Sequence, residues 1–277
     1  DTRTTPPGED KLSAGITLVK GALCAETLQE FPLIISSPGI ALATPALQIA
    51  IKAGCKVIGD IELFAQKLKT KPYQHAKCVT ITGSNGKSTV TSLLGQMALE
   101  AGIKVAVGGN IGIPALELLS PNIDLYILEL SSFQLETTQS LNADIATILN
   151  VSEDHLDRYN SYQHYIDTKH RIYQQTKIAL FNSEDPLTFV RDKKLTTESF
   201  GFNNANYHIQ TSATNENYLC RDNQVLLDVQ QLKLSGQHNW LNALATLALG
   251  EAVGLSKEAM LATLKTYTGL EHRCEFV

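Results

Sequence analysis

The chain has 277 residues, of which 43% are hydrophobic, and its formal net charge is −5. The length exceeds one ordinary domain of about 100–200 residues, and the hydrophobic content predicts packed cores rather than a disordered chain. The acidic balance argues against a general nucleic-acid binder, and the sequence contains no apolar run of the roughly 20 residues that cross a bilayer.

The first 66 residues alternate short strands and helices. We predict strands at 33–36 and 56–59, with a helix between them that begins at Thr44-Pro45 and ends at Gly54. Residues 67–76 are polar and contain a proline, which is typical of an interdomain linker. We therefore expect one domain at 1–66 and a second, larger one at 67–277.

The second domain opens with the most informative segment of the chain, Val-Thr-Ile-Thr-Gly-Ser-Asn-Gly-Lys-Ser-Thr at 79–89. It predicts a strand, a small-residue turn and the first turn of a helix. Such a turn presents backbone N–H groups and the positive end of the helix dipole to phosphate, and Lys87 adds a charge. The hydroxyl of Ser88 is placed to hold Mg²⁺. The usual phosphate-loop spacing would put a glycine where Ile81 stands, but nucleotide triphosphate binding remains the prediction.

The rest of the second domain predicts an α/β fold with a central, mostly parallel sheet. Near-continuous apolar strands separated by helices are typical of a sheet covered on both faces. The expected strands are 104–107, 125–130, 145–150 and 178–182, followed by a small β-meander at 207–234 and helices at 238–253 and 256–266.

Two polar residues follow apolar strands at their carboxyl ends, where parallel sheets bind ligands. Glu129 ends the first of these strands, and beside a phosphate loop its expected role is to hold Mg²⁺. His155 follows the second strand within an acidic cluster, so both a structural role and metal or substrate binding remain open.

Lys169 lies on the apolar stripe of a predicted helix that begins after Ser161. Its ammonium could reach water while the stem covers apolar surface. Alternatively it points into a site, where desolvation would lower its pKa and let the neutral amine form a carbamate with CO₂. In the later helix, Asn239 and Asn242 share one face and could read the edge of adenine, although ordinary polarity at a helix start is the competing interpretation.

Together these segments resemble the Mur ligase family, ATP-dependent amide-forming enzymes of peptidoglycan synthesis. The stretch Ser-Ser-Phe-Gln-Leu-Glu at 131–136 is similar to the member that adds D-glutamate. The matching stretches are 1–3, 37–40, 82–89, 108–112, 129–136, 150–157, 236–242 and 272–273.

The resemblance implies a partial Rossmann-like domain that binds a UDP substrate, followed by a central ATPase domain. It also implies that the strand before Asp1 and a C-terminal domain beyond the linker at about 269–277 are missing, so that this fragment alone does not complete the reaction. The implied setting is the bacterial cytoplasm, which agrees with five cysteines that show no metal-like spacing. We expect a monomer.

The resemblance also assigns roles to single residues. Lys87, His155 and Lys169 would serve catalysis, and the family's lysine at the last position is carbamylated. The implied nucleotide-binding residues are Gly83, Asn85, Gly86, Lys87, Ser88, Thr89, Asn239, Asn242 and Arg273. Two Mg²⁺ ions would be held by Ser88, Glu129, His155 and Lys169. The UDP substrate would be bound by Asp1, Thr2, Arg3, Ser37, Gly39, Asn110, Ser131 and Gln134.

The implied reaction joins D-glutamate to UDP-N-acetylmuramoyl-L-alanine through an acyl phosphate formed with ATP. Three alternatives stay open. One is a sister ligase that acts on another amino acid or adds glutamate to folate, and another is a nucleotide-binding ATPase module without ligase activity. A dinucleotide-dependent oxidoreductase is disfavoured because no G-x-G-x-x-G occurs in the sequence.

Overall fold

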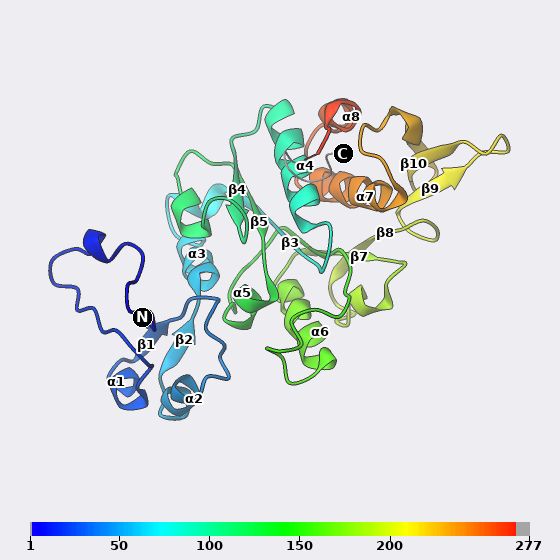
Figure 1. Cartoon of the computed structure of the whole chain (residues 1–277). Helices are drawn as coiled ribbons and strands as arrows, with labels where there is room; N and C mark the ends of the chain where they lie inside the picture. Colours follow the sequence, from blue (N-terminus) through cyan, green and yellow to red (C-terminus); the bar gives the residue numbers. More distant parts are fainter. Residues whose placement is uncertain (1, 270–277) are drawn as a thin grey trace. The chain divides into compact units, whose positions relative to one another are not determined.

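The computed structural model describes residues 2–269 of the chain (Figure 1). The contacts divide it into two compact units, Asp1–Gly59 and Asp60–Val277. None of the helices within residues 2–269 combines the length and the apolar character that crossing a bilayer requires.

The first unit is built on two parallel strands, β1 (Leu33–Ile35) and β2 (Lys56–Ile58), with Leu33 opposite Lys56. Helix α2 (Pro45–Lys52) connects them, as predicted. Thr44 does not cap it with its side chain, because its hydroxyl donates to the carbonyl of Ala41 at 2.7 Å. The remaining elements of this unit are η1 (Glu9–Lys11) and α1 (Ala25–Gln29).

The boundary between the two units lies after Gly59, earlier than the predicted boundary at residue 66. The reason is helix α3 (Asp60–Leu68), whose Phe64 is fully buried in the second unit and meets the ring of Tyr126 edge-on at 5.2 Å. The polar segment after α3 is also more ordered than a linker, because it forms the short helix η2 (Tyr73–His75).

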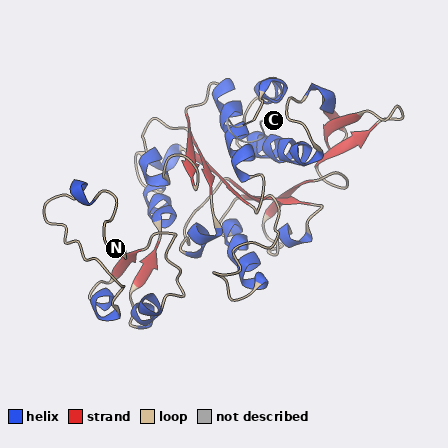
Figure 2. Ribbon diagram, viewed as in Figure 1, coloured by secondary structure: helices blue, strands red, loops and turns tan. Residues whose placement is uncertain are grey.

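The second unit contains one sheet of nine strands in the order β11-β10-β9-β8-β7-β6-β3-β5-β4 (Figure 2). Between β4 and β9, each pair of adjacent strands is parallel, which confirms the predicted mostly parallel sheet. These strands are β3 (Lys77–Thr82), β4 (Val105–Gly109), β5 (Leu125–Glu129), β6 (Ile145–Ile148), β7 (Ile178–Asn182), β8 (Thr196–Phe200) and β9 (Tyr207–Thr211).

The predicted β-meander is present as β9, β10 (Asn217–Arg221) and β11 (Gln224–Asp228), which pair in antiparallel fashion. It does not form a separate sheet. Strand β8, which the sequence analysis missed, joins it to the parallel strands through the pair Phe200 and Tyr207.

Helices cover both faces of the nine-stranded sheet (Figure 1). One face carries α4 (Lys87–Glu100), α7 (Gln237–Ala252) and α8 (Lys257–Thr266), and the other carries α3, α5 (Ser132–Glu136) and α6 (Tyr162–His170). Alternate residues of one strand enter the two cores, as pleating requires: Val79 and Ile81 pack on the α4 side and Cys78 on the α3 side. The carboxyl ends of the parallel strands therefore form one rim.

Candidate functional site

The turn between β3 and α4 has the geometry of a phosphate-binding loop. Gly86 precedes the helix with φ +82°, a left-handed conformation that favours glycine. A Cβ atom at this position would lie 2.6 Å from Oδ1 of Asn242. Glycine therefore brings the loop against α7 while the first N–H groups of α4 stay directed into the turn.

The segment that follows β6 forms hydrogen bonds with the phosphate-binding loop. The carboxamide of Asn150 accepts from the N–H of Asn85 at 2.8 Å and donates to its carbonyl at 3.0 Å. Next to it, the N–H of Ser84 donates to the carbonyl of Asn150 at 3.0 Å. The hydroxyl of Ser84 accepts from the N–H of Ser152 at 2.9 Å. These bonds join the phosphate loop to the segment that carries His155.

Two lysines converge on one carbonyl of the loop. Nζ of Lys87 donates to the carbonyl of Gly83 at 2.8 Å, and Nζ of Lys169, from α6, donates to the same oxygen at 3.1 Å. Lys169 is 2% exposed and lies over the ring of Tyr165, 4.7 Å from its centroid. The snorkelling interpretation is wrong, because this ammonium is buried at the loop.

The environment of Lys169 disfavours its charge. The pKa of Lys169 is lowered to about 7, first by burial and also by the neighbouring charge of Lys87, while Asp154 acts in the opposite direction. At neutral pH a large fraction of this amine is therefore unprotonated, which is the form that reacts with CO₂.

Glu129 ends β5 beside the phosphate loop, since it pairs with Ile81 of β3. It is 2% exposed, and its Oε1 accepts from Nδ2 of Asn110 at 2.9 Å. Its Oε2 is buried and has no hydrogen-bond partner among residues 2–269. A buried carboxylate oxygen without a partner is costly, and a cation would satisfy it. Ser88, the other predicted ligand of this ion, is buried in the first turn of α4.

His155 lies in a more exposed setting than Glu129 and Lys169. Its side chain is half exposed, with Nε2 3.4 Å from Asp154 and the ring 4.9 Å from that of Phe133. Among residues 2–269, no group of three or more His, Cys, Asp and Glu side chains is arranged to hold a metal. Glu129 and Lys169 are thus individually buried at the loop, while His155 lies on the surface segment beyond it.

A pocket of about 890 Å³ opens beside the phosphate loop, a size suited to a nucleotide. Asn239 and Asn242 share its lining with Gly86 and Thr89. Asn242 donates to Oδ1 of Asn239 at 3.1 Å, so the two carboxamides form one polar edge. The sequence analysis missed several lining residues, among them Leu149, Asn150, Asn182, Phe200, Lys233, Leu234 and His238. Asn150 and Asn182, each at or beside the end of a predicted apolar strand, carried a recognisable signal.

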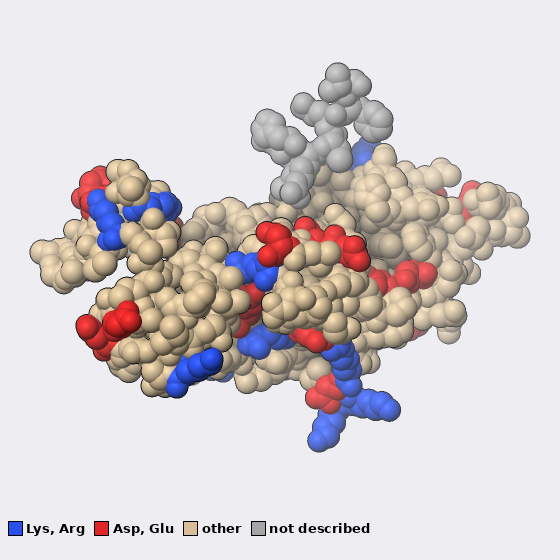
Figure 3. All heavy atoms as spheres, turned by 60° about the horizontal axis from the view of Figure 1, so that its bottom comes forward, with Lys and Arg blue, Asp and Glu red and all other residues tan. Residues whose placement is uncertain are grey.

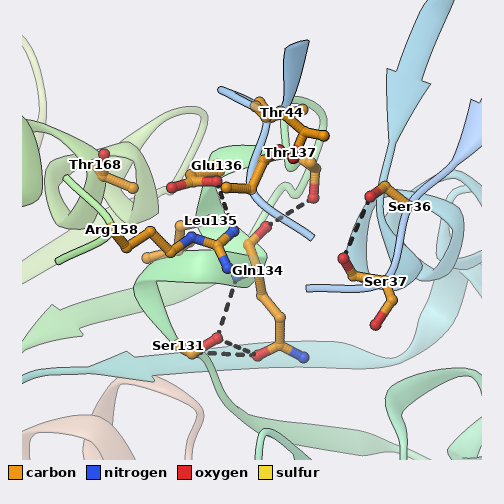
Figure 4. A network of polar contacts seen from close by, with 12 residues as sticks. Ser36, Ser37, Thr44, Ser131, Gln134, Leu135, Glu136, Thr137, Arg158 and Thr168 are labelled. Atoms are coloured by element: carbon orange, nitrogen blue, oxygen red, sulfur yellow. Dashed lines mark hydrogen bonds and ion pairs between the residues drawn. The ribbon is translucent and has the colours of Figure 1, made fainter. Parts of the chain in front are cut away.

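The predicted substrate residues Ser131 and Gln134 form a capping box at the start of α5 (Figure 4). The N–H of Gln134 donates to Oγ of Ser131 at 3.2 Å, and the N–H of Ser131 donates to Oε1 of Gln134 at 3.1 Å. Nε2 of the same Gln134 side chain donates to Oδ2 of Asp60 at 3.2 Å. These side chains are therefore held in fixed positions at the strand rim.

The other predicted substrate residues lie mainly in the first unit. Thr2, Arg3, Ser37 and Gly39 are exposed there, whereas Asn110 belongs to the second unit. Asp1 and Arg273 lie outside the described residues.

The comparisons with known proteins identify the class. Residues 81–250 match the family model described as the Mur ligase middle domain, and residues 1–59 match the one described as Mur ligase MurD-like, N-terminal domain. The chain belongs to the Mur ligase family.

Within that family, the chain is similar to relatives that share one enzyme name. The chain is 51% identical over 279 residues to the UDP-N-acetylmuramoylalanine–D-glutamate ligase of Escherichia coli strain K12, a match that covers 100% of this chain and 62% of the relative. It is also 51% identical to the ligase of the same name from Photorhabdus laumondii, with 99% of this chain and 61% of the relative covered. The chain thus spans less than two thirds of the length of these relatives.

Solved structures support the fold alone, because their sequences are more distant. The UDP-N-acetylmuramate:L-alanyl-gamma-D-glutamyl-meso-diaminopimelate ligase from Neisseria meningitides superposes with a TM-score of 0.64 at 18% identity, covering 98% of this chain and 90% of that one. The UDP-N-acetylmuramate-alanine ligase MurC from Thermotoga maritima gives 0.59 at 23% identity, covering 91% and 58%.

Proposed function

We propose that this chain contains the nucleotide-binding part of a bacterial, cytoplasmic ATP-dependent ligase that joins D-glutamate to UDP-N-acetylmuramoyl-L-alanine in peptidoglycan synthesis. The single observation that carries the proposal is the convergence of Lys87 and Lys169 on the Gly83 carbonyl of the phosphate loop. An ordinary nucleotide-binding loop needs the first lysine only. The second, buried in a helix of the opposite layer, favours ligase chemistry over a simple ATPase module.

The reaction has two steps. The alanyl carboxylate attacks the γ-phosphorus of ATP, which forms an acyl phosphate and releases ADP. The amine of D-glutamate then attacks the activated carbonyl, loses a proton and expels phosphate from the tetrahedral intermediate. In the first step two anions must approach each other, so the protein has to offset their repulsion.

The residues of the loop are suited to this task. Lys87 would leave the carbonyls of Gly83 and Ser84, to which it donates now, and contact the β and γ phosphates. The N–H groups that follow Gly86 would bind the same phosphates. The adenine would enter the pocket lined by Asn239 and Asn242.

We propose two sites for Mg²⁺. The buried, unpartnered Oε2 of Glu129 fits a cation, and Ser88 would complete that site with the phosphates. The second site would use His155 and Lys169, after the neutral amine has attacked CO₂ and released a proton to water. When bound, the ions would neutralise charge on the phosphates and on the attacking carboxylate.

The UDP-sugar substrate is proposed to be bound by Asp1, Thr2, Arg3, Ser37, Gly39, Asn110, Ser131 and Gln134. Arg273 is proposed to contact the nucleotide. Basic and acidic side chains occur in small mixed groups on the face drawn in Figure 3, which supports a local ligand site rather than a broad nucleic-acid surface. We propose that a single copy of the protein is sufficient.

The test uses the full-length protein with ATP and Mg²⁺. ADP release should require both UDP-N-acetylmuramoyl-L-alanine and D-glutamate, and the product should be heavier by one glutamyl residue. Thermal protection by different UDP-sugars separates the sister ligases, because only the true substrate should add to the protection given by nucleotide. ATP hydrolysis that ignores both substrates would favour the ATPase module instead.

A further inference from the structure

His155 lies on an exposed segment, yet a metal ligand has to be held in one orientation. Its backbone has φ +53°, an uncommon conformation for a residue other than glycine. Its ring contacts Phe133, with 4.9 Å between the centroids and an angle of 53° between the planes. The position of the imidazole therefore depends on how firmly the ring of Phe133 is held.

Arg158 holds that ring and belongs to the same segment as His155. Its guanidinium lies over Phe133, 3.8 Å from the ring centroid, and the backbone N–H of Arg158 donates to the carbonyl of His155 at 3.0 Å. Nη2 of Arg158 also pairs with Oε2 of Glu136 at 2.9 Å, as Figure 4 shows. The ring of Phe133 thus contacts two side chains of the segment from His155 to Arg158, the imidazole of the first residue and the guanidinium of the last.

The pair of Arg158 and Glu136 is unlike an ordinary surface ion pair. The two side chains are only 10% and 11% exposed, whereas the pair of Arg191 and Asp167 is 55% and 48% exposed. The attraction between a guanidinium and an aromatic ring is stronger at a partly desolvated site than at one fully exposed to water. The planar guanidinium of arginine can stack on the ring and pair with the carboxylate at once, whereas the ammonium of lysine has no planar face for stacking.

The helix that carries Phe133 and Glu136 is itself fixed. Helix α5 starts at the capping box of Ser131 and Gln134. Near its end, Arg171 donates to the carbonyl of Leu135 at 2.7 Å and to that of Thr138 at 2.8 Å. The contacts of Arg158 therefore anchor the His155 segment to a rigid support.

We propose that Arg158 is the positioning residue for His155, acting through the ring of Phe133, and that it sets the affinity of the second Mg²⁺ site. The inference rests on the proposed function, in which His155 binds that ion. Some residues contact a metal ligand, and not the metal itself, and so fix the orientation of that ligand. Replacing such a residue typically lowers metal affinity about 10–100-fold. A purely structural ion pair would change stability and leave the metal affinity alone.

The experiment compares three variants of the full-length protein. Arg158→Lys keeps the charge but loses the planar contact with Phe133. Arg158→Met removes both, and it is made together with Glu136→Gln so that no carboxylate is left unpaired. Arg191→Met is the matched control, since it removes an exposed arginine–aspartate pair of the same unit.

Two measurements are made at one fixed pH. The first is the Mg²⁺ concentration for half-maximal ligase activity, which should rise at least about tenfold in the Met variant, less in the Lys variant and not in the control. The second needs neither metal nor substrate: the His155 ring proton signal in NMR, assigned with His155→Gln, should move because the Phe133 ring no longer faces the imidazole.

The two measurements distinguish a failure of the Arg158 inference from a failure of the proposed function. An unchanged Mg²⁺ requirement and an unmoved His155 signal in a folded Arg158 variant would overturn the inference while the proposed function stands. If the wild-type protein shows no ligase activity, the proposed function fails, and the NMR signal still reports whether Arg158 orients His155. Should the Met variant not fold, the Lys variant decides by the same two measurements.

Discussion

Asn150 pairs with the backbone of Asn85 as a neighbouring strand would, because its carboxamide both accepts from the N–H at 2.8 Å and donates to the carbonyl at 3.0 Å. Asn85 lies in the phosphate loop, and Asn150 follows strand β6 and leads into the His155 segment. One side chain thus fixes the shape of the loop and joins it to the segment proposed to hold the second metal.

We expect Asn150→Ala to weaken ATP binding more than it slows the chemical step. The variant loses two hydrogen bonds of about 1 kcal/mol each, so the KM for ATP should rise roughly tenfold. Steady-state kinetics of the full-length protein measure this change. Asn122→Ala, at an exposed asparagine before β5, is the control. An unchanged KM for ATP would show that the loop keeps its shape without the carboxamide.

Lys169→Ala should reduce ligase activity by about a hundredfold or more, since the proposed carbamate would be absent. Formate or acetate should restore part of the activity by placing a carboxylate where the carbamate would be. Lys177→Ala, which removes an exposed lysine paired with Asp144, should keep full activity. Full activity of Lys169→Ala without any added acid would refute the carbamate role.

The buried lysine also predicts a pH-dependent stability. The pKa of Lys169 is about 7 in the folded protein, below the ordinary value of 10.5. Between these values the unfolded chain binds a proton that the folded chain has lost, so stability rises with pH in this window. Below about pH 7 the cost of burying the charge is present in full.

Lys169→Met should therefore be more stable than the wild type at pH 7, on the order of a few kcal/mol, because one pKa unit corresponds to about 1.4 kcal/mol. The difference should narrow as the pH approaches 10. Urea unfolding of both proteins in CO₂-free buffer, without nucleotide, gives the comparison. A difference that stays constant from pH 7 to pH 10 would contradict the burial argument.

Glu129→Gln should abolish the stabilisation that Mg²⁺ gives to the wild-type protein with ATP. The amide can still accept from Asn110, so the fold should survive, but the partnerless oxygen no longer carries charge for a cation. Affinity for Mg²⁺-ATP should fall roughly a hundredfold, the upper end for groups around metal sites. Affinity for ATP without Mg²⁺ should change by less than about twofold.

Calorimetry with and without Mg²⁺ separates the two affinities. Glu117→Gln replaces an exposed glutamate of the short helix η3 (Ala115–Leu118) and should behave as the wild type. Equal loss of affinity with and without Mg²⁺ would mean that Glu129 shapes the site without binding the ion.

Features set by neighbouring residues were predictable from the sequence. The turn at 83–86 has two glycines between a β-branched strand and a helix, so the phosphate loop could be recognised directly. Lys169 falls on an apolar stripe of helical period, which places it on the packed face of its helix but leaves open whether its ammonium reaches water or a site. The alternation of apolar strands and helices predicts the parallel sheet. All three depend on local periodicity and turn chemistry, which are written in consecutive residues.

The tertiary structure alone decided which distant groups meet. No local pattern shows that Lys169 donates to the carbonyl of Gly83 or that Asn150 hydrogen-bonds to the backbone of Asn85. Nor does any local pattern show that Leu149, Phe200 and His238 line one pocket. The predicted domain boundary at residue 66 differs from the observed one after Gly59 for the same reason. The sequence of α3 does not show that its Phe64 packs against Tyr126 of the second unit. Such contacts join residues far apart in the chain, and their geometry follows from how layers pack, which single-sequence periodicity does not encode.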